Sequence, residues 1–104
     1  MRALLLSDIH ADPDYALRCR SATGAPLGSY GCDSPFYLLD RTLEAAKRVL
    51  AEPSMLLILG DLVRHDSHST PTLAHEVFAN VTRRIANKFP GISSCAVVIG
   101  NNDV

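Results

Sequence analysis

Three short apolar runs, separated by longer amphipathic segments, dominate the hydrophobic pattern of the chain. The runs begin at Leu4, Met55 and Cys95, and glycine or polar residues end each of them. Short apolar runs with such boundaries are typical of buried β-strands. In the segments between the runs, apolar residues recur every three or four positions, which is the spacing of helices. The pattern therefore predicts strands that alternate with helices.

The predicted helices have recognisable first and last residues. Ser34-Pro35 is predicted as the N-cap and first position of a helix that runs to about Ala51. Thr70-Pro71 is predicted to begin a second helix in the same way, and Pro90-Gly91 to end it. The apolar positions expected to face the core are Phe36, Leu39, Leu43, Ala46 and Leu50 in the first helix, and Leu73, Ala74, Val77, Phe78, Val81, Ile85 and Phe89 in the second.

The order of these elements determines the expected fold class. With right-handed crossovers it gives an α/β fold, a βαβαβ unit with a three-stranded parallel sheet. Parallel sheets usually carry helices on both faces, whereas two helices leave one face of this sheet thinly covered. We therefore expect residues 1–104 to be the first part of a larger domain.

Composition narrows the classes of function. A hydrophobic content of 47% is typical of a folded chain, and 10 basic against 11 acidic residues give a formal net charge of −1. This balance predicts no diffuse cationic surface for nucleic acid or anionic membranes. No apolar run approaches the roughly 20 residues of a membrane span, and Met1-Arg2-Ala3 leads into the first strand instead of a signal peptide. Any anionic substrate is expected to be held by local groups.

The residues that follow the apolar runs are of metal-binding type. Asp8 and His10 follow the first run, Asp61 the second and Asn101 the third. In a parallel sheet such strand ends gather at one edge. Asp8 and His10 are expected to point the same way, because alternate residues of extended backbone do so. A lone acid after a strand is often a cap or turn residue, but the repetition at every run favours a metal site.

Two cysteines flank a long loop rich in glycine and serine. A disulfide between Cys19 and Cys32 would stabilise this loop and would indicate an oxidising compartment. Two reduced cysteines are nearly as compatible with the sequence, so both states stay open. Cys95, at the start of the third run, is predicted to be a small buried hydrophobic residue.

The strand-end motifs resemble those of a known family. Asp8-x-His10, Gly60-Asp61 and Gly100-Asn101-Asn102-Asp103 are similar to the first three sequence blocks of the calcineurin-like metallophosphoesterases, over essentially the whole chain. The resemblance implies that the βαβαβ unit is the N-terminal half of this family's sandwich-shaped domain. The later histidine ligands of the family have no counterpart here, so the 104-residue chain alone is expected to be nearly inactive.

The resemblance narrows to one branch of the family. Segments 7–15, 31–35 and 60–66 are similar to acid sphingomyelinase-like enzymes and endopolyphosphatases, while Arg64-His65-Asp66 and the stretch 100–104 look more like the endopolyphosphatases. This implies a phosphate-containing substrate, with inorganic polyphosphate expected first and a sphingomyelin-type phosphodiester second. It also implies a vacuolar, lysosomal or secretory location.

The resemblance also implies roles for individual residues. Two divalent ions, Zn²⁺, Mn²⁺, Co²⁺ or Mg²⁺, would catalyse hydrolysis of phosphoanhydride or phosphodiester bonds. Asp8 and His10 would hold the first ion, Asp61 would bridge both and Asn101 would bind the second. The alternative to an enzyme is a non-catalytic α/β binding or regulatory module, in which the acids at the strand ends hold one ion or none.

The expected catalytic and substrate-binding residues follow the second and third motifs. His65 is the candidate for a phosphate contact or proton donor, and Asp66 for orienting it, unless Asp66 is only a loop acid. Arg64 would help to hold a polyanion, although a solvated loop arginine explains it equally well. Asn102 occupies a catalytic position where most of the family has histidine. Its amide cannot donate a proton with a useful pKa, so that role is absent or passes to His65.

Three further features are predicted to be functionally neutral. His68 is placed in a polar loop and His75 on the solvent-facing side of the second helix. Asn80-Val81-Thr82 is a glycosylation sequon that falls in the middle of that helix, so it matters only if the protein is secretory.

Overall fold

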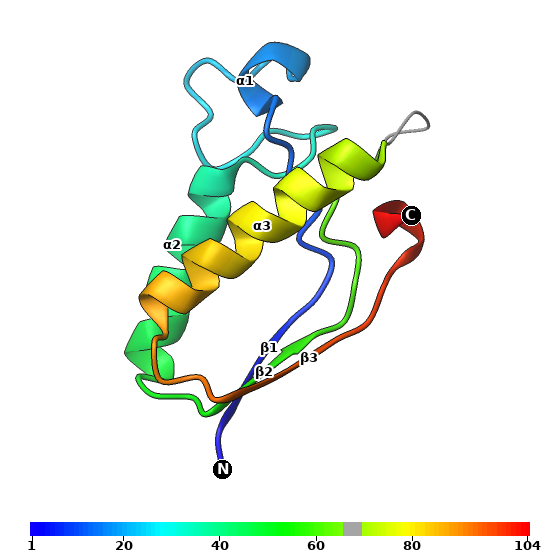
Figure 1. The fold of residues 1–104 in the computed structure, drawn as a ribbon. Helices are drawn as coiled ribbons and strands as arrows, with labels where there is room; N and C mark the ends of the chain where they lie inside the picture. The colour runs from blue at the N-terminus through cyan, green and yellow to red at the C-terminus, as the bar shows by residue number, and fades with distance from the viewer. Residues whose placement is uncertain (66–69) are drawn as a thin grey trace.

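In the computed structural model, which describes residues 1–65 and 70–104, three strands form one parallel sheet (Figure 1). The strands are β1 (Ala3–Leu6), β2 (Met55–Ile58) and β3 (Ser94–Val97), and they lie in that order across the sheet. Helix α2 (Phe36–Val49) connects the first two strands and helix α3 (Pro71–Lys88) connects the second and third. The predicted α/β class and βαβαβ order are confirmed.

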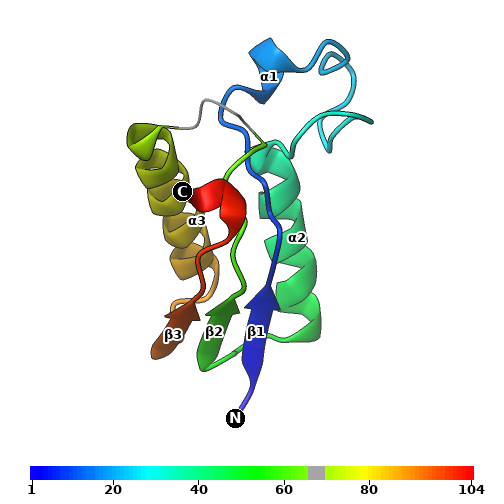
Figure 2. The ribbon, with the colours of Figure 1, turned by 90° about the vertical axis from the view of Figure 1, so that its right-hand side faces the viewer.

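The helices lie on one face of the sheet. Right-handed crossovers between strands in this sequential order require such an arrangement, and Figure 2 shows α2 and α3 on the same side of the strands. Leu4, Leu56 and Ile58 face the helices and are buried in the core. On the other face Leu5, which pairs in register with Leu57, is 55% exposed. The expectation of one thinly covered face is confirmed.

The apolar stripes of the helices form the rest of the core. The buried residues are Leu39 and Leu43 of α2, Val77, Val81 and Ile85 of α3, and Phe89, which follows α3. Partly buried neighbours pack against this core, namely Phe36, Ala46, Leu73, Ala74 and Phe78. Leu50, the last residue of the predicted first stripe, is the half-buried C-cap of α2 and is not part of this cluster. The helical spacing in the sequence therefore identified the packed faces correctly.

The two helix starts differ in how well they were predicted. Thr70 caps α3 as expected, because its side chain accepts a hydrogen bond of 3.1 Å from the Leu73 N–H, with Pro71 in the first turn. For α2 the prediction was wrong, since Pro35 and not Ser34 is the N-cap. Ser34 is instead part of a parallel bridge with Ala11, in which its backbone serves as a short extension of the sheet.

Sequence periodicity missed the shortest elements and the exposure of one strand. Helix α1 (Tyr15–Arg18) and the 3-10 helix η1 (Asn101–Asp103) are each too short to show a repeat. Cys95 is exposed, so its predicted burial was wrong. All four residues of β3 are exposed, so this strand lies outside the core that the helices form with β1 and β2.

The loop between α1 and α2 is folded back on itself. A disulfide joins Cys19 to Cys32, whose Cα atoms are 5.7 Å apart. The Tyr15 hydroxyl donates a hydrogen bond of 2.7 Å to the Ala25 carbonyl across the same loop. Of the two cysteine states left open by the sequence, the structure has the disulfide. Within residues 1–65 and 70–104, the helices lack the combination of length and apolarity that a membrane span requires.

Candidate metal centre at the strand ends

The residues after β1 and β2 bring three potential ligands together. Asp8, His10 and Asp61 each offer one ligand atom, and these atoms all lie within 4.8 Å of one another. The His10 Nε2 atom is 3.6 Å from Asp8 Oδ1 and 4.0 Å from Asp61 Oδ2. Two carboxylates and an imidazole at this spacing are a donor set for a divalent cation.

The hydrogen bonding of His10 supports this interpretation. Its Nδ1 atom lies 3.0 Å from the Val63 carbonyl oxygen, which can only accept, so Nδ1 carries the proton. In the neutral ring the lone pair is then on Nε2, the atom that faces the Asp8 and Asp61 carboxylates. The repulsion between this lone pair and the two anions is relieved by a metal ion between Nε2 and the carboxylates, or by a second proton on the ring. A carbonyl that orients a histidine in this way is typical of metal sites.

Backbone strain is concentrated at the same residues. Asp8, His10 and Asp61 have φ values of 53°, 44° and 53°, and among the described residues they are the non-glycine positions with positive φ. Left-handed backbone costs an L-residue roughly 1–2 kcal/mol, and such strain clusters at functional sites. The side chains of Asp8 and His10 therefore come together because both residues have left-handed backbone. The sequence-based explanation, that alternate residues of extended backbone point the same way, was wrong.

Strain at Asp8 leads to a prediction about stability. The Asp8 side chain is 65% exposed, so its removal costs few contacts. We expect Asp8→Gly to be more stable than Asp8→Ala by about 1 kcal/mol, because glycine adopts positive φ without the Cβ penalty. Both variants lose the carboxylate and should lose metal affinity equally. Denaturant unfolding measures the difference, and equal midpoints would show that Asp8 is not strained.

Two glycines allow the second and third strand ends to touch. A Cβ atom on Gly60, whose φ is +95°, would lie 2.7 Å from the Gly100 nitrogen. A Cβ atom on Gly100 would lie 2.1 Å from Asp61 Oδ1 and 2.5 Å from the Asp61 nitrogen. Glycine in both motifs is therefore explained by close approach of the two backbones beside Asp61.

Asp103 holds these strand ends together, a role that the sequence reasoning missed. Its buried carboxylate accepts four backbone hydrogen bonds. Oδ2 accepts from Asp61 N and Gly100 N, both at 2.8 Å, and Oδ1 accepts from Leu62 N at 2.9 Å and Val63 N at 3.1 Å. The only sequence signal was an acid three residues after Gly100. The Asp103 carboxylate thus holds the backbone after β2 against the backbone after β3.

The two asparagines of the third motif lie in η1 beside Asp61. The backbone N–H of Asn102 donates to Asp61 Oδ1 at 3.0 Å, so Asn102 orients the carboxylate through its main chain. Asn101 is exposed and lies between Gly100 and Asn102, both next to Asp61. Metal ligation by the Asn101 amide oxygen and a catalytic role for the Asn102 side chain both stay predictions.

Arg64 is a buried structural residue, not a solvated loop arginine. Its side chain is 10% exposed, and its NH1 atom lies 2.8 Å from Asp12 Oδ1 and 2.7 Å from Asp14 Oδ2. These contacts tie the segment after the first motif to the segment after the second. The predicted substrate contact of Arg64 stays untested, and its engagement with two carboxylates does not favour it.

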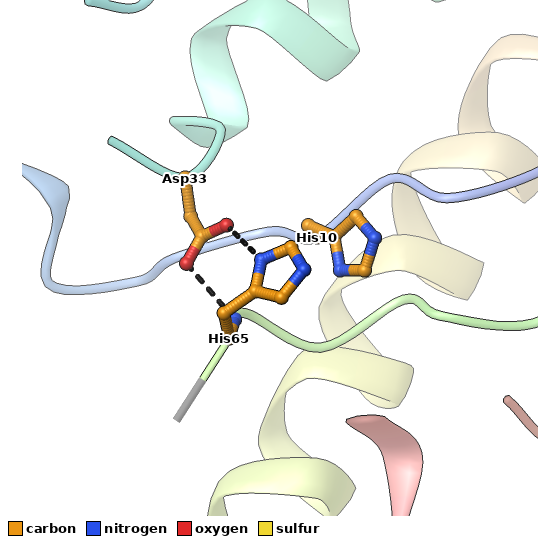
Figure 3. A group of neighbouring side chains, drawn as sticks. All are labelled: His10, Asp33 and His65. Atoms are coloured by element: carbon orange, nitrogen blue, oxygen red, sulfur yellow. Dashed lines mark hydrogen bonds and ion pairs between the residues drawn. The ribbon is translucent and has the colours of Figure 1, made fainter. Parts of the chain in front are cut away.

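His65 lies against the metal-binding residues. Its ring stacks on that of His10, with ring centroids 4.1 Å apart and an interplanar angle of 24° (Figure 3). Asp33, to which the sequence analysis gave no role, accepts hydrogen bonds from the ring and the backbone of His65. Asp66, the predicted orienting residue, and His68 lie outside the described residues.

The remaining neutral features lie away from this site. His75 is exposed on α3, as predicted. Asn80 is in the middle of the same helix, where its side-chain amide donates a hydrogen bond of 3.0 Å to the Glu76 carbonyl. Its glycosylation stays an untested prediction.

Comparison with known proteins gives a consistent family. Residues 1–104 match the sequence profile of the calcineurin-like phosphoesterases. The acid sphingomyelinase-like phosphodiesterase 3b of Homo sapiens is 31% identical over 112 residues, and the cyclic GMP-AMP phosphodiesterase SMPDL3A of Mus musculus is 30% identical over 113 residues. The alignments cover 94% of this chain but 24% and 25% of those proteins, so the chain spans about a quarter of their length.

Proposed function

Because the chain belongs to the calcineurin-like phosphoesterase family, we propose that it carries the first part of a divalent-metal centre that hydrolyses phosphodiesters. The observation that supports this most directly is the group formed by Asp8, His10 and Asp61, whose ligand atoms lie within 4.8 Å of one another. Strained backbone at all three residues agrees with a functional site.

The side chains have separate tasks in this proposal. Asp8 and the Nε2 atom of His10 would hold one ion, Asp61 would be shared with a second ion, and the Asn101 amide oxygen would bind that second ion. Hydrogen bonding from Asn102 to Asp61 Oδ1 and from His10 Nδ1 to the Val63 carbonyl fixes these ligands before metal binds. The bound ions would neutralise charge on the phosphoryl oxygens and activate the attacking water.

His65 is the proposed donor to the leaving-group oxygen. Its side chain is 64% exposed, so a substrate can reach it, and it stacks on the proposed ligand His10. As the P–O bond breaks, the doubly protonated His65 ring passes its Nε2 proton to the leaving oxygen and keeps the Nδ1 proton on the Asp33 side. The carboxamide of Asn102 has no such proton to give.

The comparisons change the expected order of substrates. The names of the two relatives describe phosphodiesterases, and they give no support to the polyphosphate preference expected from Arg64-His65-Asp66. The Arg64 guanidinium is also engaged by Asp12 and Asp14. We therefore rank a phosphodiester, including a sphingomyelin-type one, above inorganic polyphosphate.

A hydrolysis assay on the protein that carries this chain tests the substrate class. We expect a chromogenic phosphodiester to be cleaved faster than inorganic polyphosphate. Faster cleavage of polyphosphate would reverse the ranking.

Metal removal tests the dependence on divalent ions. Treatment with a chelator is expected to abolish phosphodiester cleavage, and added Zn²⁺, Mn²⁺ or Co²⁺ to restore it, because charge on the transferred group must be neutralised. Unfolding of the chelated protein should remain cooperative, since the core does not depend on the site. Cleavage that persists without metal would contradict the proposal, and absence of metal binding would favour the non-catalytic module.

A further inference from the structure

A carboxylate outside the strand-end motifs holds His65 at two points. Asp33 Oδ1 lies 2.7 Å from the His65 Nδ1 atom, and Asp33 Oδ2 accepts a hydrogen bond of 2.9 Å from the His65 backbone N–H (Figure 3). The Asp33 side chain is 16% exposed, whereas that of His65 is 64% exposed. A largely buried acid thus fixes both the ring and the main chain of an accessible histidine.

The fold explains how two residues 32 positions apart meet. The buried residue Ala11 forms parallel bridges to Ser34 on one side and to Val63 on the other. Asp33 directly precedes Ser34, and His65 follows two residues after Val63. Asp33 also directly follows Cys32, which is bonded to Cys19. Its backbone is therefore anchored on both sides.

The contact determines which nitrogen of His65 is available. A carboxylate can only accept, so His65 Nδ1 carries a proton and donates it to Asp33. In the doubly protonated ring the Nε2–H is then left to donate to a substrate. Because the ring also stacks on His10, at a centroid distance of 4.1 Å, its plane is fixed beside the candidate metal centre.

A second metal site at these residues is the competing interpretation. His10, Asp33 and His65 also have ligand atoms within 4.8 Å of one another. However, His10 Nδ1 donates to the Val63 carbonyl and its Nε2 faces Asp8 and Asp61, while both Asp33 oxygens accept from His65. Binding a cation there would require several of these contacts to break, so the geometry favours hydrogen bonding over metal ligation.

We propose that Asp33 is a positioning residue, which holds the His65 ring against His10 with Nε2 free for the leaving-group oxygen of the phosphodiester. The proposal rests on the phosphodiesterase function proposed above. In this role Asp33 acts only through His65. Its contribution is to limit the ring to one orientation, with Nδ1–H on Asp33 and Nε2 toward the substrate, which lowers the entropic cost of the productive geometry.

Leaving-group dependence tests the proposal. In Asp33→Asn one oxygen is replaced by an NH₂ group, so a single acceptor oxygen remains for the two N–H donors of His65, and one of the two contacts must break. In the protein that carries this chain, we expect kcat to fall by roughly 10–100-fold for a phosphodiester with an alkyl leaving group, as is typical for loss of an outer-shell partner. For a nitrophenyl diester, whose leaving oxygen needs little help, we expect less than a roughly threefold fall. KM should change little in either case.

Two further variants separate positioning from a general structural effect. The double variant Asp33→Asn with His65→Gln should be no slower than His65→Gln alone, because Asp33 acts only through His65. Asp40→Asn, at the partly exposed ion pair with Arg84 between the helices, is the matched control and should retain the activity of the parent. Equal losses on both diesters, or additive losses in the double variant, would overturn the proposal.

A spectroscopic measurement distinguishes failure of this proposal from failure of the proposed function. ¹⁵N chemical shifts should show His65 protonated at Nδ1 in the parent chain, with this preference weakened in Asp33→Asn, where one oxygen serves both N–H donors. A His65 ring protonated at Nε2 alone in the parent would overturn the positioning role. If the parent cleaves no phosphodiester but shows the expected tautomer, then the proposed function fails while the Asp33 contact stands.

Discussion

Replacing Gly100 with alanine is expected to destabilise the chain by on the order of 3 kcal/mol and to abolish metal binding. The added Cβ would lie 2.1 Å from Asp61 Oδ1 and 2.5 Å from the Asp61 nitrogen. The second of these atoms belongs to the backbone, so no side-chain rotation relieves the overlap. The end of β3 must move away from β2, which breaks the hydrogen bond from Asn102 to Asp61.

Gly91 provides the matched control for this substitution. It lies in the turn between α3 and β3, and a Cβ atom there would meet nothing within 4 Å. We expect Gly91→Ala to change the free energy of unfolding by less than about 0.5 kcal/mol. Denaturant unfolding and metal titration of both variants measure the contrast. If Gly100→Ala were as stable as Gly91→Ala, the close approach of the strand ends would be refuted.

Asp103→Asn is expected to cost about 2–5 kcal/mol of stability, because an amide cannot replace the carboxylate at this position. Asp103 uses both oxygens to accept hydrogen bonds from four backbone N–H groups. Asparagine has one acceptor oxygen, and its NH₂ group would face two donors. Metal affinity should fall by roughly 10–100-fold as well, since Asp61 loses the anchor of its backbone.

The control for Asp103→Asn is the same chemical change at Asp40. That residue pairs with Arg84, and the two side chains are 41% and 29% exposed. A pair with this exposure contributes about 0–1 kcal/mol. Equilibrium unfolding compares the two variants. Amide hydrogen exchange at Leu62 and Val63 reports whether their N–H groups have lost the hydrogen bonds to the Asp103 carboxylate. Similar midpoints for both would mean that Asp103 does not hold the strand ends.

The architecture could be predicted from sequence because it depends on hydrophobic spacing. The apolar runs and the residues recurring at helical intervals identified the strands, α2 and α3, since burial on one face imposes that spacing. The predictions failed where contacts between distant segments, which the sequence pattern does not show, decided the role of a residue. Ser34 has the side chain of an N-cap, yet its backbone is used in a bridge to Ala11. Cys95 is apolar by type but lies on β3, whose four residues are all exposed.

The candidate site was predictable in its residue types and less so in its geometry. Asp8, His10 and Asp61 were identified because strand ends converge at one edge of a parallel sheet. Their left-handed backbone has no signature in the sequence, because it follows from tertiary contacts around each residue. Asp33 and Asp103 were missed for a related reason. Each acts on a residue at least 32 positions away, at a contact made only by the folded chain.

Metal titration of the chain and of Asp61→Asn tests the central claim most directly. The claim is that the strand ends form a divalent-metal site in which Asp61 is a shared ligand. The asparagine oxygen can still accept the hydrogen bond from Asn102, so the fold should be retained and the unfolding midpoint unchanged. Calorimetry should then show an affinity for Zn²⁺ or Mn²⁺ that falls by more than the roughly 10–100-fold typical of an outer-shell change. Equal affinities in the parent and in Asp61→Asn would contradict the account.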